Sequence, residues 1–162
     1  MKNFLKKNIL LCVTGGIAAY KSAELTRLFK KEGADVRIVM TESAKEFITP
    51  LTLQAVSGNQ IHDSLLDEKA EAAMGHIELA KWADIILIAP CTADSLSKIT
   101  HGRADDLMGA LILATKASIF IAPAMNMNMW LDPSTQDNYK TLLSRQINFI
   151  GPNDGEQACG DV

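Results

Sequence analysis

DIILIAP, residues 84–90, is the stretch of sequence that decides the fold. This apolar run has the length of a strand and is rich in isoleucine, which is typical of a strand buried on both faces of a parallel sheet. Similar runs precede and follow it: NILLCVT (8–14), DVRIVM (35–40), SIFIA (118–122) and INFIG (147–151). The sequence therefore predicts a sheet with the 84–90 strand at its centre.

Helical patterns separate the first of these strands. Apolar residues recur at helical spacing over 18–31, and Gly33 then provides a C-terminal cap. After the 35–40 strand, Ser43 and the glutamate three residues later, Glu46, match a capping box, which predicts the start of another helix.

Further helices are predicted before the central strand. Thr49 followed by Pro50 is typical of a helix start, and Gly58 marks its end. Residues 59–75 are polar and acidic, which indicates a surface loop leading to a helix from His76. The alternation of strands and helices predicts a single-domain α/β fold: a doubly wound parallel sheet with helices on both faces, of the Rossmann-like (flavodoxin-like) type.

Composition narrows the class of protein. With 162 residues, 48% of them hydrophobic, the chain is expected to form one domain over 1–162. The formal charge of -3 and pI near 5.6 argue against a nucleic-acid partner. No apolar run approaches the roughly 18 residues of a membrane span, and no signal peptide is evident. Three well-separated cysteines favour free thiols and a cytoplasmic location.

The loops that follow the strands predict a ligand site. In TGGIAAYK (14–21), Gly15 and Gly16 let a phosphate approach the backbone, although the spacing is not that of a dinucleotide site. Thr41 stands where such a site would carry an acidic residue, so a mononucleotide fits better. In PCTADSLSKI (90–99), Thr92 and Ser95 add hydroxyl groups, for which ordinary helix capping is the alternative.

PAMNMNMW (123–130) places a lone amide, Asn126, just after a predicted strand. An amide there can hold a carboxylate without adding charge. A turn asparagine beside core methionines is the alternative, and for Met129 packing in the core competes with a place beside the ligand.

These motifs, with GHIEL (75–79) and ACGD (158–161), resemble the homo-oligomeric flavin-containing cysteine decarboxylases over essentially the whole chain. The resemblance implies bound FMN and removal of the carboxylate of 4'-phosphopantothenoylcysteine through transient oxidation to a thioaldehyde, within coenzyme A biosynthesis. It also implies a trimer or trimer-based dodecamer, with the flavin between subunits. The apolar run at 108–116 would suit such an interface or a buried helix equally well.

The resemblance also assigns residues. His76 would move the thiol proton, Asn126 would orient the substrate carboxylate, and Cys159 would donate the final proton. The substrate contacts would be Asn126, Met129, Ala158 and Asp161, and no metal ligands are expected. The flavin contacts would be Gly15, Gly16, Ile17, Thr41, Phe47, Pro90, Thr92, Ala93, Asp94 and Ser95.

Two features of the motifs bear on these implications. Thr92 and Asp94 stand where the family more usually has serine and asparagine, and ACGDV normally continues into a glycine-rich stretch. The chain is therefore expected to end within the motif of the substrate flap, and a fused phosphopantothenoylcysteine synthetase domain is a further expected partner. The alternatives are a peptidyl-cysteine decarboxylase, a flavin prenyltransferase and a non-enzymatic regulator with the same fold.

Overall fold

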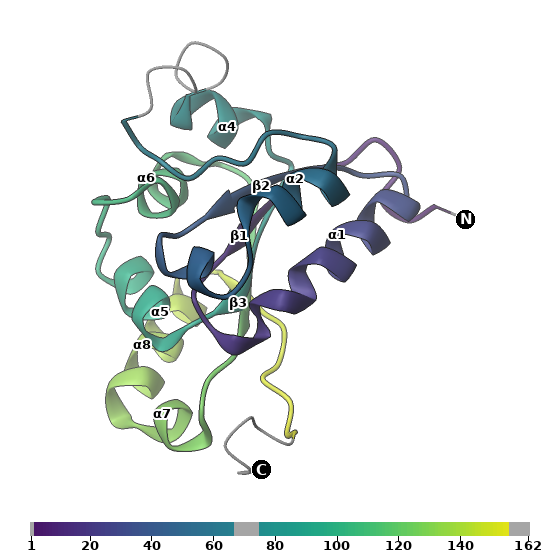
Figure 1. The fold of residues 1–162 in the computed structure, drawn as a ribbon. Coiled ribbons are helices and arrows are strands. Elements are labelled where there is room, and N and C mark those ends of the chain that lie inside the picture. Colours follow the sequence, from purple (N-terminus) through teal and green to yellow (C-terminus); the bar gives the residue numbers. More distant parts are fainter. Residues whose placement is uncertain (1, 67–74, 156–162) are drawn as a thin grey trace.

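The computed structural model describes residues 2–66 and 75–155, and within them the chain forms one five-stranded parallel sheet. Its strands run in the spatial order β2-β1-β3-β4-β5 (Figure 1). Their bounds are β1 (Asn8–Val13), β2 (Asp35–Met40), β3 (Ile85–Cys91), β4 (Ser118–Pro123) and β5 (Asn148–Phe149). In this doubly wound order, β2 is added on one side of β1 and the later strands on the other side, so the strand order reverses between β1 and β3.

Helices cover both faces of the sheet. One face carries η1 (Ile17–Tyr20), α1 (Lys21–Lys31), η2 (Ser43–Glu46) and α2 (Pro50–Ser57). The other carries α4 (His76–Trp82), α5 (Ala93–Thr100), α6 (Leu107–Ala114) and α8 (Pro133–Ser144). A short helix, α7 (Met127–Leu131), follows β4 and packs on α8.

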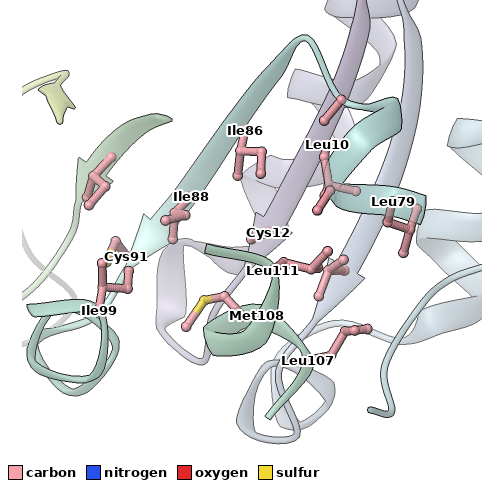
Figure 2. Packing of buried hydrophobic residues seen from close by; sticks show 14 of the residues in the cluster. Leu10, Cys12, Leu79, Ile86, Ile88, Cys91, Ile99, Leu107, Met108 and Leu111 are labelled. Carbon is pink, nitrogen blue, oxygen red and sulfur yellow. The ribbon is translucent and has the colours of Figure 1, made fainter. Parts of the chain in front are cut away.

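Two apolar layers follow from the alternation of side chains along the strands. Leu10 and Cys12 of β1 point into the layer shown in Figure 2, where they meet Met108 and Leu111 of α6. The intervening residues of β1 point into the opposite layer, under α1 and α2. Because both faces are covered, the central strands β1 and β3 are almost entirely apolar, which explains the runs in the sequence.

The predicted fold class is confirmed, and several local predictions hold with it. Thr49 caps α2 by accepting a hydrogen bond from the N–H of Thr52 at 3.2 Å, and Gly58 ends that helix with a φ of 75°. Gly33, with a φ of 98°, follows the end of α1. The run at 108–116 lies largely in α6, whose Leu107, Met108, Gly109 and Leu111 are buried.

The capping box at Ser43 and Glu46 is wrong. Both residues lie inside the 3-10 helix η2, and no side-chain cap forms at its N-cap residue Glu42. Thr41 provides the hydroxyl instead, because its Oγ1 accepts from the N–H of Ala44 at 3.3 Å. The hydroxyl that satisfies the N–H groups of η2 is thus two residues earlier than the sequence pattern suggests.

Other boundaries differ by less. The helix expected over 18–31 is divided into η1 and α1 at Lys21, and the last strand covers only Asn148–Phe149 of the five residues expected. Residues 59–75 were expected to be a surface loop. Part of this segment lies against the sheet instead, because His62 forms a parallel bridge with Val39 at the outer edge of β2. Residues 67–74 lie outside the described part of the chain. No helix among the described residues has the length and apolar character needed to cross a bilayer.

Candidate functional site

The carboxyl ends of β1 and β3 are joined by a buried threonine. Thr14 donates its hydroxyl hydrogen to the carbonyl oxygen of Pro90 at 2.6 Å and accepts from the backbone N–H of Thr92 at 3.1 Å. The loops that follow the two strands are therefore held together at the point where the chain leaves toward opposite faces of the sheet. In sheets of this order, that point is where ligands bind.

Gly15 and Gly16 differ in what surrounds them. A Cβ on Gly15 would lie within 2.8 Å of the backbone of Ser43, so the close approach of the first loop to η2 requires a glycine. A Cβ on Gly16 would meet only a methyl group of Thr92, at 3.6 Å, and the backbone of Gly16 is extended (φ -141°). Nothing in the described fold therefore requires glycine at position 16, and the space beside it is open to a ligand.

The start of η2 adds hydroxyl groups to the same edge. The hydroxyl oxygens of Thr41 and Ser43 lie 3.3 Å apart. The N–H of Thr41 bonds the carbonyl of Val13 at 3.1 Å, which fixes η2 beside the first loop. Phe47 and Ile17 are 46% and 65% exposed, so two predicted flavin contacts are large apolar side chains left open to solvent.

The start of α5 presents backbone donors. The hydroxyl of Thr92 accepts from the N–H of Ser95 at 3.1 Å and donates to the hydroxyl of Ser95 at 3.1 Å. The side chains of both residues are thus engaged at the cap of α5, which agrees with helix capping, the alternative to ligand binding given for them in the sequence. The N–H groups of Ala93 and Asp94, in the first turn of α5, have no carbonyl within the helix to bond and are available to a ligand.

Asn126 lies between β4 and α7 as the N-cap of α7. Its Oδ1 accepts from the N–H of Asn128 at 2.8 Å, which holds the amide at the start of the helix. Met129, on the same helix, is 49% exposed, so the interpretation as a core residue is wrong for it. An open hollow of about 340 Å³ lies beside it, lined by Ala93, Asn128, Met129, Asp132 and Thr135.

His76 lies elsewhere. It begins α4, which packs against α6 at one end of the molecule, whereas α7 lies at the other end (Figure 1). Its Nδ1 is buried and makes no hydrogen bond with the described residues. A buried ring nitrogen without a partner calls for a functional explanation. Within one chain, however, His76 and Asn126 are not brought together.

The cysteines separate into two groups. Burial raises the pKa of the Cys12 thiol to about 12 and also raises the pKa of Cys91, so both remain protonated at neutral pH. This agrees with their interpretation as core residues. Ala158, Cys159 and Asp161 lie outside the described residues.

The sequence missed three residues that shape this edge. Thr14 links the two central loops, Ser43 packs against Gly15, and Thr135 lines the hollow from α8. A hydroxyl directly after a buried strand is a usable signal for Thr14. For Thr135 the usable signal is Asp132 followed by Pro133, a pair typical of a helix start, which predicts that Thr135 lies in the first turn of α8.

The fold and this edge define a class of protein. A doubly wound sheet whose first loop is open at Gly16, with hydroxyl groups and helix N–H groups at one switch point, is typical of domains that bind a mononucleotide-like ligand. The motifs at 14–21 and 90–99 supply Gly16 and the helix N–H groups, and Thr41 and Ser43 supply the hydroxyl groups.

The chain belongs to the Flavoprotein family, whose model matches residues 2–162. It is 57% identical over 162 residues to the coenzyme A biosynthesis bifunctional protein CoaBC of Vibrio vulnificus strain YJ016, with all of this chain and 40% of that protein covered. It is 55% identical over 156 residues to CoaBC of Escherichia coli K12, with 96% and 38% covered. The chain thus spans about 40% of the length of these relatives.

Solved structures agree with this placement. A PPC decarboxylase mutant complexed with pantothenoylaminoethenethiol is 34% identical, with a TM-score of 0.83 over 96% of this chain and 87% of the other. The FMN-dependent cysteine decarboxylase SpaF is 30% identical, with a TM-score of 0.87 over 94% and 87%. The resemblance to flavin-containing cysteine decarboxylases is confirmed, and membership of the family supports a flavin as the cofactor.

Proposed function

We propose that this domain binds FMN at the carboxyl edge of its sheet and converts 4'-phosphopantothenoylcysteine into 4'-phosphopantetheine and carbon dioxide. The observation that carries the proposal is the likeness to a PPC decarboxylase, at 34% identity over nearly the whole chain. The relatives at 55–57% identity are named for coenzyme A biosynthesis, which supports the same substrate.

The residues at this edge fit FMN. Gly16 leaves room for a phosphate or a ring against the backbone, and Thr41 with the N–H groups of Ala93 and Asp94 offers donors to a phosphate. Ile17 and Phe47 offer apolar surface to a flavin ring. Pro90 would contribute through its position between Thr14 and the start of α5.

Bound FMN supplies the two-electron oxidation that turns the cysteine side chain of the substrate into a thioaldehyde, and later returns the same electrons. His76 accepts the thiol proton at the start of the reaction. Asn126 orients the carboxylate, and its neutral amide avoids the ground-state stabilisation that a lysine or arginine would provide. Cys159 protonates the enethiolate, with Ala158, Asp161 and Met129 beside the substrate.

This assignment requires more than one copy of the chain. His76 and Asn126 lie toward opposite ends of the molecule (Figure 1), so a site that uses both is completed by a neighbouring subunit. A homo-oligomer, a trimer or a dodecamer built from trimers, meets this need. A second partner is the fused synthetase domain, since the curated relatives are bifunctional and the chain covers about 40% of them.

Substitutions in the first loop test the position of the flavin. Gly16→Ala is expected to weaken FMN binding at least about tenfold without lowering the melting temperature of the apoprotein, because the added methyl group meets ligand rather than protein. Gly15→Ala is the matched comparison, and it is expected to destabilise the apoprotein by about 1–3 kcal/mol, since Ser43 must move. Quenching of FMN fluorescence and thermal unfolding measure the two effects. Unchanged FMN affinity in Gly16→Ala would place the flavin elsewhere.

The reaction itself is tested by mass spectrometry of the product. Purified protein with FMN is expected to release carbon dioxide and 4'-phosphopantetheine from 4'-phosphopantothenoylcysteine. Cys159→Ala is expected to accumulate the enethiol, two mass units lighter than the product, because the final protonation is lost. Cys12→Ala controls for loss of a thiol, since Cys12 is buried in the core. Fully reduced product from Cys159→Ala would rule out the role of that thiol, and an absence of carbon dioxide from the unaltered protein would rule out the activity.

A further inference from the structure

The hollow beside α7 has a chemistry of its own. It lies where the N-termini of α5 and α8 approach α7, and its lining combines two apolar contributions, from Ala93 and Met129, with three polar side chains, Asn128, Asp132 and Thr135. At about 340 Å³ it is large enough for part of a ligand rather than a whole one. Ala93 and Met129 were assigned above to flavin and substrate, but the three polar residues were not.

Thr135 is the residue that calls for an explanation. The residue is only 6% exposed and lines the hollow, and within residues 2–66 and 75–155 its hydroxyl forms no hydrogen bond. Its oxygen is not among the fully enclosed polar atoms of the described residues, so it is reached from the hollow. Two other buried threonines behave differently: Thr26 and Thr100 each donate to the carbonyl one helical turn earlier, both at 2.8 Å. The hydroxyl of Thr135 has no carbonyl partner of this kind and opens onto the hollow, so it can donate to or accept from a polar group that enters there.

The two neighbouring polar residues are fixed by the backbone. The N–H of Asp132 bonds the carbonyl of Asn128 at 3.0 Å, which places these residues one helical turn apart on the same side of α7. Asp132 Oδ1 accepts from the N–H of Ser134 at 2.8 Å, as the cap of α8. Its carboxylate forms no ion pair within residues 2–66 and 75–155.

The charge of the hollow selects against anions. Among its five lining residues, Asp132 carries an acidic side chain, and none is a lysine, arginine or histidine. A phosphate or a carboxylate would be repelled there. A hydroxyl or an amide N–H would instead find an acceptor in Asp132, a donor and acceptor in Thr135, and apolar contact with Met129.

We propose that this hollow binds the neutral, hydroxyl- or amide-bearing chain of a ligand of the decarboxylase site, with Thr135 and Asp132 as its hydrogen-bonding partners. The inference rests on the proposed function. Two sources carry this chemistry: the ribityl chain of FMN, with its hydroxyl groups, and the pantothenoyl arm of the substrate, with a hydroxyl and two amide N–H groups. In either case Asp132 keeps the phosphate end of the ligand outside the hollow.

Thr135→Val tests the proposal, because valine keeps the shape of the side chain and removes the hydroxyl. In the FMN-loaded oligomer we expect a rise of about 3- to 10-fold either in the dissociation constant of FMN or in the KM for 4'-phosphopantothenoylcysteine, with kcat within about twofold. Thr135→Ser restores the hydroxyl and is expected to return both constants to within about twofold of the original. A rise in the dissociation constant of FMN identifies the ribityl chain, and a rise in KM identifies the pantothenoyl arm.

Thr141→Val is the matched control, since Thr141 lies on the same helix and does not line the hollow. If Thr135→Val changes neither constant, or if Thr135→Ser fails to restore the one that changed, the proposal is overturned. Failure of the proposed function is a separate result. In that case the unaltered protein releases no carbon dioxide, and direct titration of FMN and of 4'-phosphopantothenoylcysteine into Thr135→Val still decides whether the hollow binds either chain.

Discussion

The substitution His76→Asn is expected to abolish turnover and to leave the flavin bound. Asparagine occupies similar space and keeps hydrogen-bonding groups, but it cannot exchange a proton near neutral pH, so the opening step loses its base. The expected decrease in kcat is at least about 100-fold, the lower end of what a positioned acid or base contributes. We expect FMN to stay bound, because the loops after β1 and β3 that are proposed to hold it lie at the opposite end of the molecule from α4 and are not altered by the substitution (Figure 1).

His101→Asn is the matched control for this result. His101 is exposed at the C-terminal end of α5, where its Nδ1 lies 2.7 Å from the carbonyl oxygen of Ser97, and no motif assigns it a role. Carbon dioxide release and the visible flavin spectrum are measured for both variants. More than a tenth of the original kcat in His76→Asn would contradict the role of this histidine, and loss of the flavin spectrum would mean that the substitution acts through the cofactor site.

The strands were predictable from the sequence because a strand that is buried on both faces consists of a continuous run of apolar residues. The 84–90 run lies in the middle of the sheet, and its residues Ile86 and Ile88 are fully buried. Such a position accepts few polar residues, so apolar runs mark the strands. The last strand was predicted too long. β5 lies at the edge of the sheet and pairs with β4 alone, and Ile150, which follows it, is 54% exposed, so an apolar residue there does not indicate a buried strand.

Local signals were less reliable where tertiary contacts compete with them. Ser43 and Glu46 match a capping box, but Ser43 packs against Gly15, and η2 begins after Thr41. The contact between Gly15 and Ser43 joins residues 28 positions apart, and no local pattern reports it. The capping at Thr49 and Thr92 followed the sequence because the side-chain oxygen of each bonds an N–H group in the first turn of its own helix.

The residues of the site were identifiable from motifs, but their arrangement was not. Thr14 and Thr92 meet because β1 and β3 are neighbours in a parallel sheet, which the alternation of elements implies. The separation of His76 from Asn126 depends on the direction of α4 along the outside of the sheet. Motif spacing contains no information on that direction, so the separation of the two residues within one chain emerges only from the structure.

Two inactive variants are expected to restore each other's activity. Asn126→Asp keeps the cap of α7, because aspartate caps a helix as well as asparagine does, but its charge repels the substrate carboxylate. Alone, His76→Asn and Asn126→Asp are each expected to be inactive. If every site takes His76 from one subunit and Asn126 from its neighbour, co-expressed variants assemble some sites in which both residues are intact.

Random mixing in equal amounts sets the size of this effect. A site is intact when its histidine comes from the Asn126→Asp chain and its asparagine from the His76→Asn chain, which gives about a quarter of the activity of the unaltered oligomer over the whole mixture and about a third in isolated mixed trimers. Different affinity tags on the two chains isolate the mixed oligomers, and carbon dioxide release measures the recovery. Co-expression of the same two tags on His76→Asn alone provides the background. If mixed oligomers are as inactive as that background, the two residues do not act across a subunit boundary, and the chain must instead bring α4 to α7 within one subunit.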